Sequence, residues 1–141
     1  MKIDKIMKKI IILLFLLLNS CSEHALEVVD GDTIKTEIGT IRFSGINTPE
    51  KGECYYEEAT NRTKELILYQ KIILEEDYVD EDEYGRKLRY VYVDDKFVNG
   101  ILVKEGYARV FDAFNKTTKR YVELKILEEE AKKDQKGIWS C

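Results

Sequence analysis

The order in which short strand-like runs and longer helical patterns follow one another is the strongest constraint on the fold of this 141-residue chain. The first three runs are short, and turns that contain Gly31 and Gly39 separate them. A longer stretch follows in which apolar and small side chains recur at helical spacing. We therefore expect strands at 26–30, 33–38 and 40–46 and an amphipathic helix at 53–69.

The second half of the chain predicts a hairpin and two further helices. Residues 71–79 and 87–93 alternate like paired strands on either side of a polar turn. Three elements follow: a short helix at 99–105 with Asn99 as its N-cap, a strand at 107–111 and a last helix at 118–135. Five main strands with a helix after the third predict an α+β, mainly β fold, namely a five-stranded OB-fold (oligonucleotide/oligosaccharide-binding) barrel with three helices. A meandering α+β sandwich is the alternative.

The first 20 residues have the composition of a secretion signal. Four lysines precede the apolar run Ile10–Leu18. A helix of this length rises only about 13–14 Å, whereas a bilayer core is about 30 Å thick, so the run is too short for a stop-transfer helix. Its end, Leu-Asn-Ser-Cys at 18–21, resembles a bacterial lipoprotein signal. We expect a signal peptide at 1–20, lipidation of Cys21, a tether at 21–25 and one domain at 26–141, with an ordinary secretory signal as the alternative.

The cysteine count supports the lipid. Three cysteines are an odd number for an exported protein. If Cys21 takes the lipid, Cys54 and Cys141 remain as a pair, and an oxidising compartment would allow them to form a disulfide. Two unpaired thiols are the alternative.

The chain is acidic. Without its first 20 residues it contains 19 Lys and Arg against 26 Asp and Glu, a formal charge of −7. Such a protein exerts no global attraction on nucleic acid, so any chemistry on phosphates needs local arginines and a bound cation. The imbalance argues against a protein that coats DNA.

Hard oxygen donors follow two of the predicted strands. Asp32 lies in the turn after the first strand, and Asn47 and Thr48 lie at the end of the third. If these strands are neighbours, the Asp32 carboxylate, the Asn47 amide oxygen and the Thr48 main-chain carbonyl converge. Oxygen donors favour Ca²⁺ or Mg²⁺ over zinc. Taken alone, the sequence around Asp32 is also typical of a turn, and the sequence around Asn47 and Thr48 is typical of the end of a strand.

One further carboxylate and two arginines complete a set suited to phosphodiester chemistry. Glu50 could accept a proton from an attacking water, although an acidic residue here could also start the next helix. Arg42, inside a strand, needs an anionic partner, which could be Glu37 or a bound phosphate. Arg42 and Arg86 could together clamp phosphate oxygens and stabilise the charge of the transition state.

The three strings that carry these residues, 29–33, 41–50 and 82–86, resemble those of the thermonuclease (staphylococcal nuclease-like) family in type and order. The resemblance covers residues 26–140, including the closing Gly-Ile-Trp-Ser. It implies calcium binding by Asp32, Asn47 and Thr48, a general base at Glu50, and phosphate contacts from Arg42 and Arg86. It also implies the barrel expected above.

The resemblance implies a calcium-dependent endonuclease that hydrolyses DNA and RNA and leaves 3′-phosphate ends, with Mg²⁺ as the alternative cofactor. We expect an exported monomer held by its N-terminal lipid on the outer side of a bacterial membrane, or else secreted and soluble. A non-catalytic, nucleic-acid-binding OB-fold lipoprotein is the alternative function. Among the departures from the family, Asn47 stands where Asp is usual, and Glu83 stands where a basic residue is frequent.

Overall fold

The structure, a computed structural model, describes residues 23–112 and 118–141. Its strands are β1 (Glu23–His24), β2 (Glu27–Asp30), β3 (Thr33–Thr36), β4 (Gly39–Phe43), β5 (Ile46–Asn47), β6 (Lys71–Glu81), β7 (Lys87–Val93), β8 (Lys96–Phe97) and β9 (Arg109–Val110). Its helices are α2 (Tyr56–Ile67), α3 (Val98–Lys104) and α4 (Tyr121–Lys133), followed by the 3₁₀ turn η1 (Gly137–Ser140).

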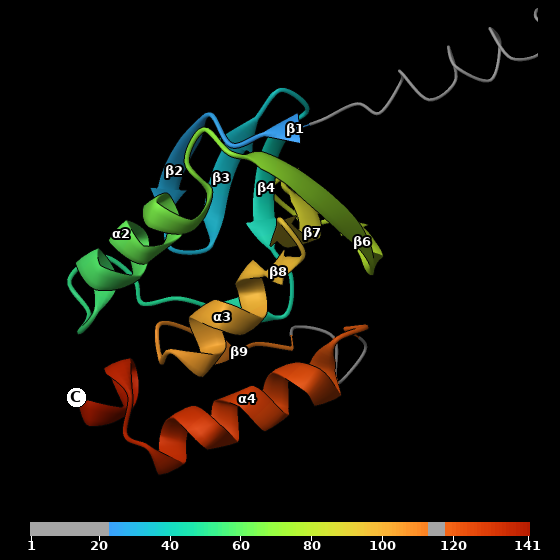
Figure 1. Ribbon diagram of the computed structural model, residues 1–141. Helices are drawn as coiled ribbons and strands as arrows, with labels where there is room; N and C mark the ends of the chain where they lie inside the picture. Colours follow the sequence, from blue (N-terminus) through green and yellow to red (C-terminus); the bar gives the residue numbers. More distant parts are fainter. Residues whose placement is uncertain (1–22, 113–117) are drawn as a thin grey trace, which may run out of the picture.

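The main sheet has the strand order β1-β6-β7-β4-β3-β2, with β8 paired to β7, and β5 pairs with β9 apart from it. The β4–β7 pair is parallel, and the other pairs are antiparallel. In Figure 1, α2 lies beside β2 and β3, while α3 and α4 lie beyond the ends of the strands. The predicted mainly β barrel with helices at these three places is confirmed.

The strand count differs from the prediction at Gly45. The expected strand 40–46 ends at Phe43 and resumes as β5, which leaves the sheet to pair with β9. Gly45 makes this break with a φ of +75°, and a Cβ there would lie 2.8 Å from Leu124 Cδ1. Only glycine adopts this conformation readily and leaves room for the packed helix.

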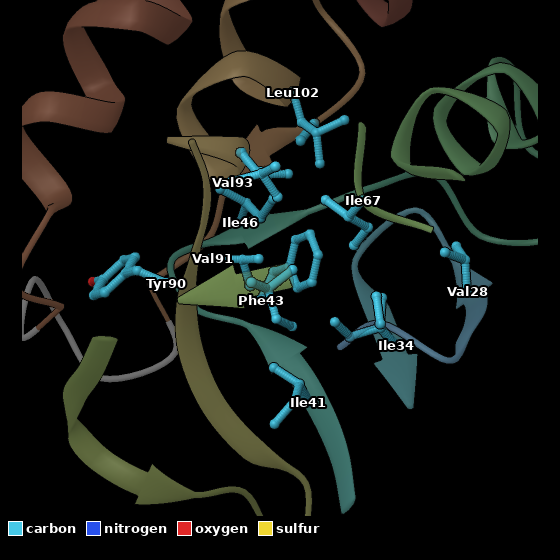
Figure 2. Packing of buried hydrophobic residues seen from close by; sticks show 14 of the residues in the cluster. Val28, Ile34, Ile41, Phe43, Ile46, Ile67, Tyr90, Val91, Val93 and Leu102 are labelled. Carbon is cyan, nitrogen blue, oxygen red and sulfur yellow. The ribbon is translucent and has the colours of Figure 1, made fainter. Parts of the chain in front are cut away.

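The barrel interior is filled by the inward side chains of the strands and helices. Figure 2 shows Phe43 in the middle of the cluster, next to Val91 and close to side chains from β3, β5 and α2. Phe43 is 1% exposed, and Ile41 and Val91 are fully buried. Burial on this scale is the main stabilising term for a domain of this size.

Tyr90 is buried in a different way. Its ring lies to one side of the cluster in Figure 2, with the hydroxyl pointing away from Phe43. That hydroxyl donates to Asp77 Oδ2 at 3.0 Å and accepts from the main-chain N of Arg120 at 3.1 Å. Tyr90 therefore ties the start of α4 to the hairpin of β6 and β7. Desolvation is the main cause that raises the pKa of this phenol.

Asn99 is not the N-cap that the sequence predicts. The helix α3 begins one residue earlier, after Phe97, and no side chain caps it. Asn99 is fully buried instead, where its side chain accepts from Val91 N at 2.9 Å and donates to the main-chain oxygen of Ser44 at 2.9 Å. The amide satisfies two buried main-chain groups, which is worth more than one exposed cap.

The expected tether also differs. Glu23–His24 pairs with the start of β6, and the fully buried Ala25 forms main-chain hydrogen bonds with Tyr69 and Gln70. The predicted signal peptide and Cys21 lie outside the described residues. Within 23–112 and 118–141, no helix is long and apolar enough to cross a membrane.

Candidate active site

A cavity of about 690 Å³ lies where the β2–β3 turn, the end of β4 and the β6–β7 hairpin meet. Five of the six residues that the sequence selects line it: Asp32, Arg42, Asn47, Glu50 and Arg86. The sixth, Thr48, lines a neighbouring cavity that shares Asn47 and Glu50 with the first. Strand pairing makes this possible, because Thr33 lies opposite Arg42 in the β3–β4 register.

Asp32 is held by its neighbours in a buried turn. Its Oδ2 accepts from Thr48 N at 2.8 Å and its Oδ1 from the Thr33 hydroxyl at 3.1 Å. The turn packs closely on Thr48, since a Cβ added to Gly31 would lie 2.7 Å from Thr48 Oγ1. Two strand exits that are 16 residues apart in the sequence are thus joined at one carboxylate.

Arg42 is the ion-pair partner of Asp32. Its Nη2 lies 3.2 Å from Asp32 Oδ2 and also donates to Asn47 Oδ1, while Nη1 donates to the main-chain oxygen of Phe43 at 2.7 Å. Burial raises the pKa of the Asp32 carboxyl and lowers that of the Arg42 guanidinium, while their mutual attraction opposes both shifts. The suggestion that Glu37 pairs with Arg42 is wrong, because Glu37 lies beside His24 and accepts from its main-chain N.

Arg86 is oriented by Asp82, a residue for which the sequence predicts no role. Asp82 Oδ2 accepts from Arg86 Nε at 2.7 Å, and Oδ1 accepts from the main-chain N of Arg86 and of Tyr84, each at 3.0 Å. Burial opposes ionisation of Asp82, but these hydrogen bonds outweigh it and lower the pKa of the carboxyl. An aspartate just before a glycine turn is a signal for such an arrangement.

Glu50 is an exposed carboxylate at the site. It follows Pro49 at the exit from β5 and lines both cavities. Its main-chain N donates to Glu53 Oε2 at 2.7 Å, and its main-chain oxygen accepts from Glu53 N at 2.9 Å. The backbone at Glu50 is therefore fixed by a tight turn.

The predicted ligands Asp32, Asn47 and Thr48 offer the oxygen atoms that a hard cation prefers. In the described part of the chain, no three His, Cys, Asp or Glu side chains gather closely enough to hold a metal ion. The predicted ligands are of another kind, since Asn47 supplies an amide oxygen and Thr48 a main-chain carbonyl. All are oxygen donors of the type that Ca²⁺ and Mg²⁺ take. Arg42 contacts the side-chain oxygens of both Asp32 and Asn47, so an ion held by these residues would share them with Arg42.

The charge around the larger cavity is mostly negative. Its only basic lining residues among those described are Arg42 and Arg86, against seven carboxylates: Asp30, Asp32, Glu50, Asp77, Glu81, Asp82 and Glu83. Two of the carboxylates neutralise these arginines, since Asp32 pairs with Arg42 and Asp82 with Arg86. A polyanion therefore meets a site that needs additional positive charge.

Cys54 and Cys141 are joined by a disulfide, with their Cα atoms 6.5 Å apart. The bond connects the segment just before α2 to the last residue, after η1. Both cysteines line the smaller cavity, next to Glu50.

Sequence comparisons show which known proteins this chain resembles. The model of the family described as Staphylococcal nuclease homologue matches residues 40–141. The SPbeta prophage-derived endonuclease YokF of Bacillus subtilis (strain 168) is 45% identical over 123 residues, which cover 79% of this chain and 42% of that protein. Endonuclease YncB of the same organism is 43% identical, over 79% of this chain and 58% of its own length. The chain thus spans about half the length of these two relatives.

A third relative matches over more of its length. The thermonuclease of Staphylococcus hyicus is 34% identical over 133 residues, which cover 86% of this chain and 78% of that protein. The chain belongs to the family of staphylococcal nuclease homologues.

Proposed function

We propose that this protein is a calcium-dependent endonuclease that hydrolyses phosphodiester bonds in DNA and RNA and leaves 3′-phosphate ends. The observation that carries the proposal is the convergence of Glu50, Arg42 and Arg86 on one cavity beside the oxygen donors of Asp32 and Asn47. The relatives are named endonucleases and a thermonuclease, which supports the same reaction.

The roles follow from the contacts. Glu50 is exposed to the solvent of the cavity and serves as the base that takes a proton from the attacking water. Arg86 uses Nε on Asp82, and no described residue hydrogen-bonds its two terminal nitrogens, which are left to bind phosphate oxygens. Arg42 adds a second positive charge beside the reacting phosphate and stabilises the charge that builds up on it.

Asp32, Asn47 and Thr48 would hold the calcium ion. A bound cation supplies positive charge to the scissile phosphate, which the acidic rim of the cavity does not. Asn47 carries no charge where the family usually has Asp, so we expect a weaker calcium site than a dicarboxylate would give.

We further propose that Cys21 is lipidated and holds the protein on the outer side of the membrane. The first described strand, β1, begins two residues after Cys21. His24 contacts Glu37, just beyond the Thr36 end of β3, whereas the cavity lies at the Thr33 end of that strand. This geometry supports an anchored enzyme whose site is turned away from its attachment point. Replacing Cys21 with Ser should move the protein from the membrane fraction to the medium.

Circular substrates test the proposed activity. A covalently closed plasmid and a circular RNA have no ends, so only an endonuclease cleaves them. We expect cleavage in Ca²⁺, less in Mg²⁺ and none in EDTA, with products that a polymerase extends only after phosphatase treatment. Binding of both polymers without cleavage in any cation would instead favour the non-catalytic binding protein.

A further inference from the structure

The loop that carries Glu50 has little packing of its own. From Glu50 to Cys54 every residue is exposed, and the cavity of about 410 Å³ lies between this loop and the C-terminal residues. Side-chain burial therefore does not hold the loop in place. A segment without buried contacts opens at low cost unless something else ties it down.

The C-terminal turn, by contrast, is well anchored. Ile138 is 5% exposed, and its main-chain N donates to Gly106 O at 2.8 Å. The Trp139 ring contacts two cations, with its centroid 5.0 Å from the Arg109 guanidinium and 4.9 Å from Lys132 Nζ. These contacts hold the turn η1 in place at the edge of the smaller cavity.

We propose that the loop 50–54 is a positioning device for Glu50, held by two ties. The first is the Cys54–Cys141 disulfide, which fixes the far end of the loop to the anchored C-terminal turn. The second is the Glu53 side chain, which accepts from the main-chain N of Glu50. The Glu53 contact closes the turn that carries Glu50, and the disulfide fastens this turn to the C-terminal residues. This inference rests on the proposed function, in which Glu50 is the base.

The chemical consequence is a nuclease whose rate depends on its redox state. Reduction by a dithiol breaks the Sγ–Sγ bond: two electrons and two protons pass to Cys54 and Cys141, and the dithiol becomes a cyclic disulfide. The freed loop then lets Glu50 leave its position. A misplacement of about 1 Å at a reacting group costs on the order of 10²-fold in rate, so we expect kcat per folded molecule to fall about 10- to 100-fold, with a smaller change in KM.

The test compares oxidised and reduced protein with and without Glu50. Both forms are assayed at a temperature at which circular dichroism shows each to be folded. In the wild type, reduction should lower kcat as stated. In the Glu50→Gln variant, reduction should leave the residual rate unchanged, because the disulfide acts through the missing base. An equal loss in both backgrounds would overturn the proposal, since the bond would then act elsewhere.

The second tie gives an independent arm with the disulfide intact. Glu53→Ala should lower kcat several-fold without changing the melting temperature, and Glu53→Gln, which keeps an acceptor oxygen, should restore most of the rate. If the reduced protein is unfolded at every temperature tested, this variant alone decides the question. A wild-type rate in Glu53→Ala would then overturn the proposal.

Hydrogen exchange separates this inference from the proposed function. In the reduced protein the amides of 48–56 should exchange faster while those of β3 and β4 stay unchanged, and equal protection of the loop in both forms would contradict the tether. Oxidised wild type that cleaves no substrate would contradict the nuclease assignment, yet the exchange experiment would still report on the loop.

Discussion

Arg42 and Asp32 form a buried ion pair, with Nη2 of the arginine 3.2 Å from Oδ2 of the carboxylate. Their side chains are only 11% and 7% exposed. Arg42 is expected to contact phosphate and Asp32 to bind a cation, so the ion pair connects the two predicted roles. It also means that a change at either residue affects folding as well as activity.

Arg42→Ala should therefore destabilise the protein as well as inactivate it. Removing one partner of a buried pair leaves an uncompensated charge and costs about 3–5 kcal/mol in the free energy of unfolding. Urea denaturation measures this. Arg62→Ala, which breaks the more exposed Arg62–Glu105 pair, is the matched control and should cost about 1 kcal/mol or less. Equal losses in the two variants would contradict the buried pair.

Asn47→Asp should tighten calcium binding, because ligand charge tunes the affinity of such sites. Isothermal titration calorimetry with Ca²⁺ measures the change directly. Asn61→Asp adds the same charge on the exposed side of α2 and should leave the affinity unchanged. Unchanged or weaker binding in Asn47→Asp would show that residue 47 is not a ligand.

Asp82→Asn should lower kcat by about tenfold, because one carboxylate holds both the side chain and the main chain of Arg86 and charge-assisted hydrogen bonds are the strong ones. Steady-state kinetics on a fluorescent oligonucleotide measure it. The neighbouring Glu83→Gln removes the same charge without these bonds. If both variants lose the same activity, the loss comes from charge and not from the orientation of Arg86.

Glu128 makes stability depend on pH. This buried carboxylate accepts from Val110 N at 2.8 Å and pairs with Lys125 and Lys132. Burial opposes ionisation, but these partners outweigh it and lower the pKa. A lowered pKa in the folded state gives stability that is present above the unfolded pKa and is lost as the pH falls through the folded one.

Glu128→Gln should accordingly be less stable than the wild type at neutral pH, and the difference should shrink between about pH 5 and pH 3. Chemical denaturation across that range measures it. Glu130→Gln, on the exposed side of the same helix, serves as the control. A stability difference that does not change with pH would mean that the effect of Glu128 is packing alone.

Local pattern predicts much of this fold. The alternation in residues 87–93 and the helical spacing of 56–67 each report on neighbours a few residues away, and the structure has β7 and α2 there. The break at Gly45 could not be predicted in this way, since it depends on Leu124 from a helix far along the chain. The same holds for Asn99, whose partners Val91 and Ser44 come from other elements.

The candidate site, like the fold, could be predicted only in part from the sequence. The residue types and their order indicated which side chains gather, and five of the six selected residues line one cavity. Their pairing depends on three-dimensional contacts: Arg42 with Asp32 across the β3–β4 register, and Arg86 with Asp82 inside its own turn. The turn sequence gives a local signal for the pairing of Arg86 with Asp82, but composition and spacing give none for the pairing of Arg42 with Asp32.

Replacing Glu50 tests the central claim most directly. With closed circular plasmid and Ca²⁺, Glu50→Gln should lower kcat by at least about 10²-fold, the size of a lost base, while the melting temperature stays that of the wild type. Glu57→Gln, an exposed change in the first turn of α2, should keep the full rate. Cleavage by Glu50→Gln at the wild-type rate, or full wild-type activity in excess EDTA, would contradict the account.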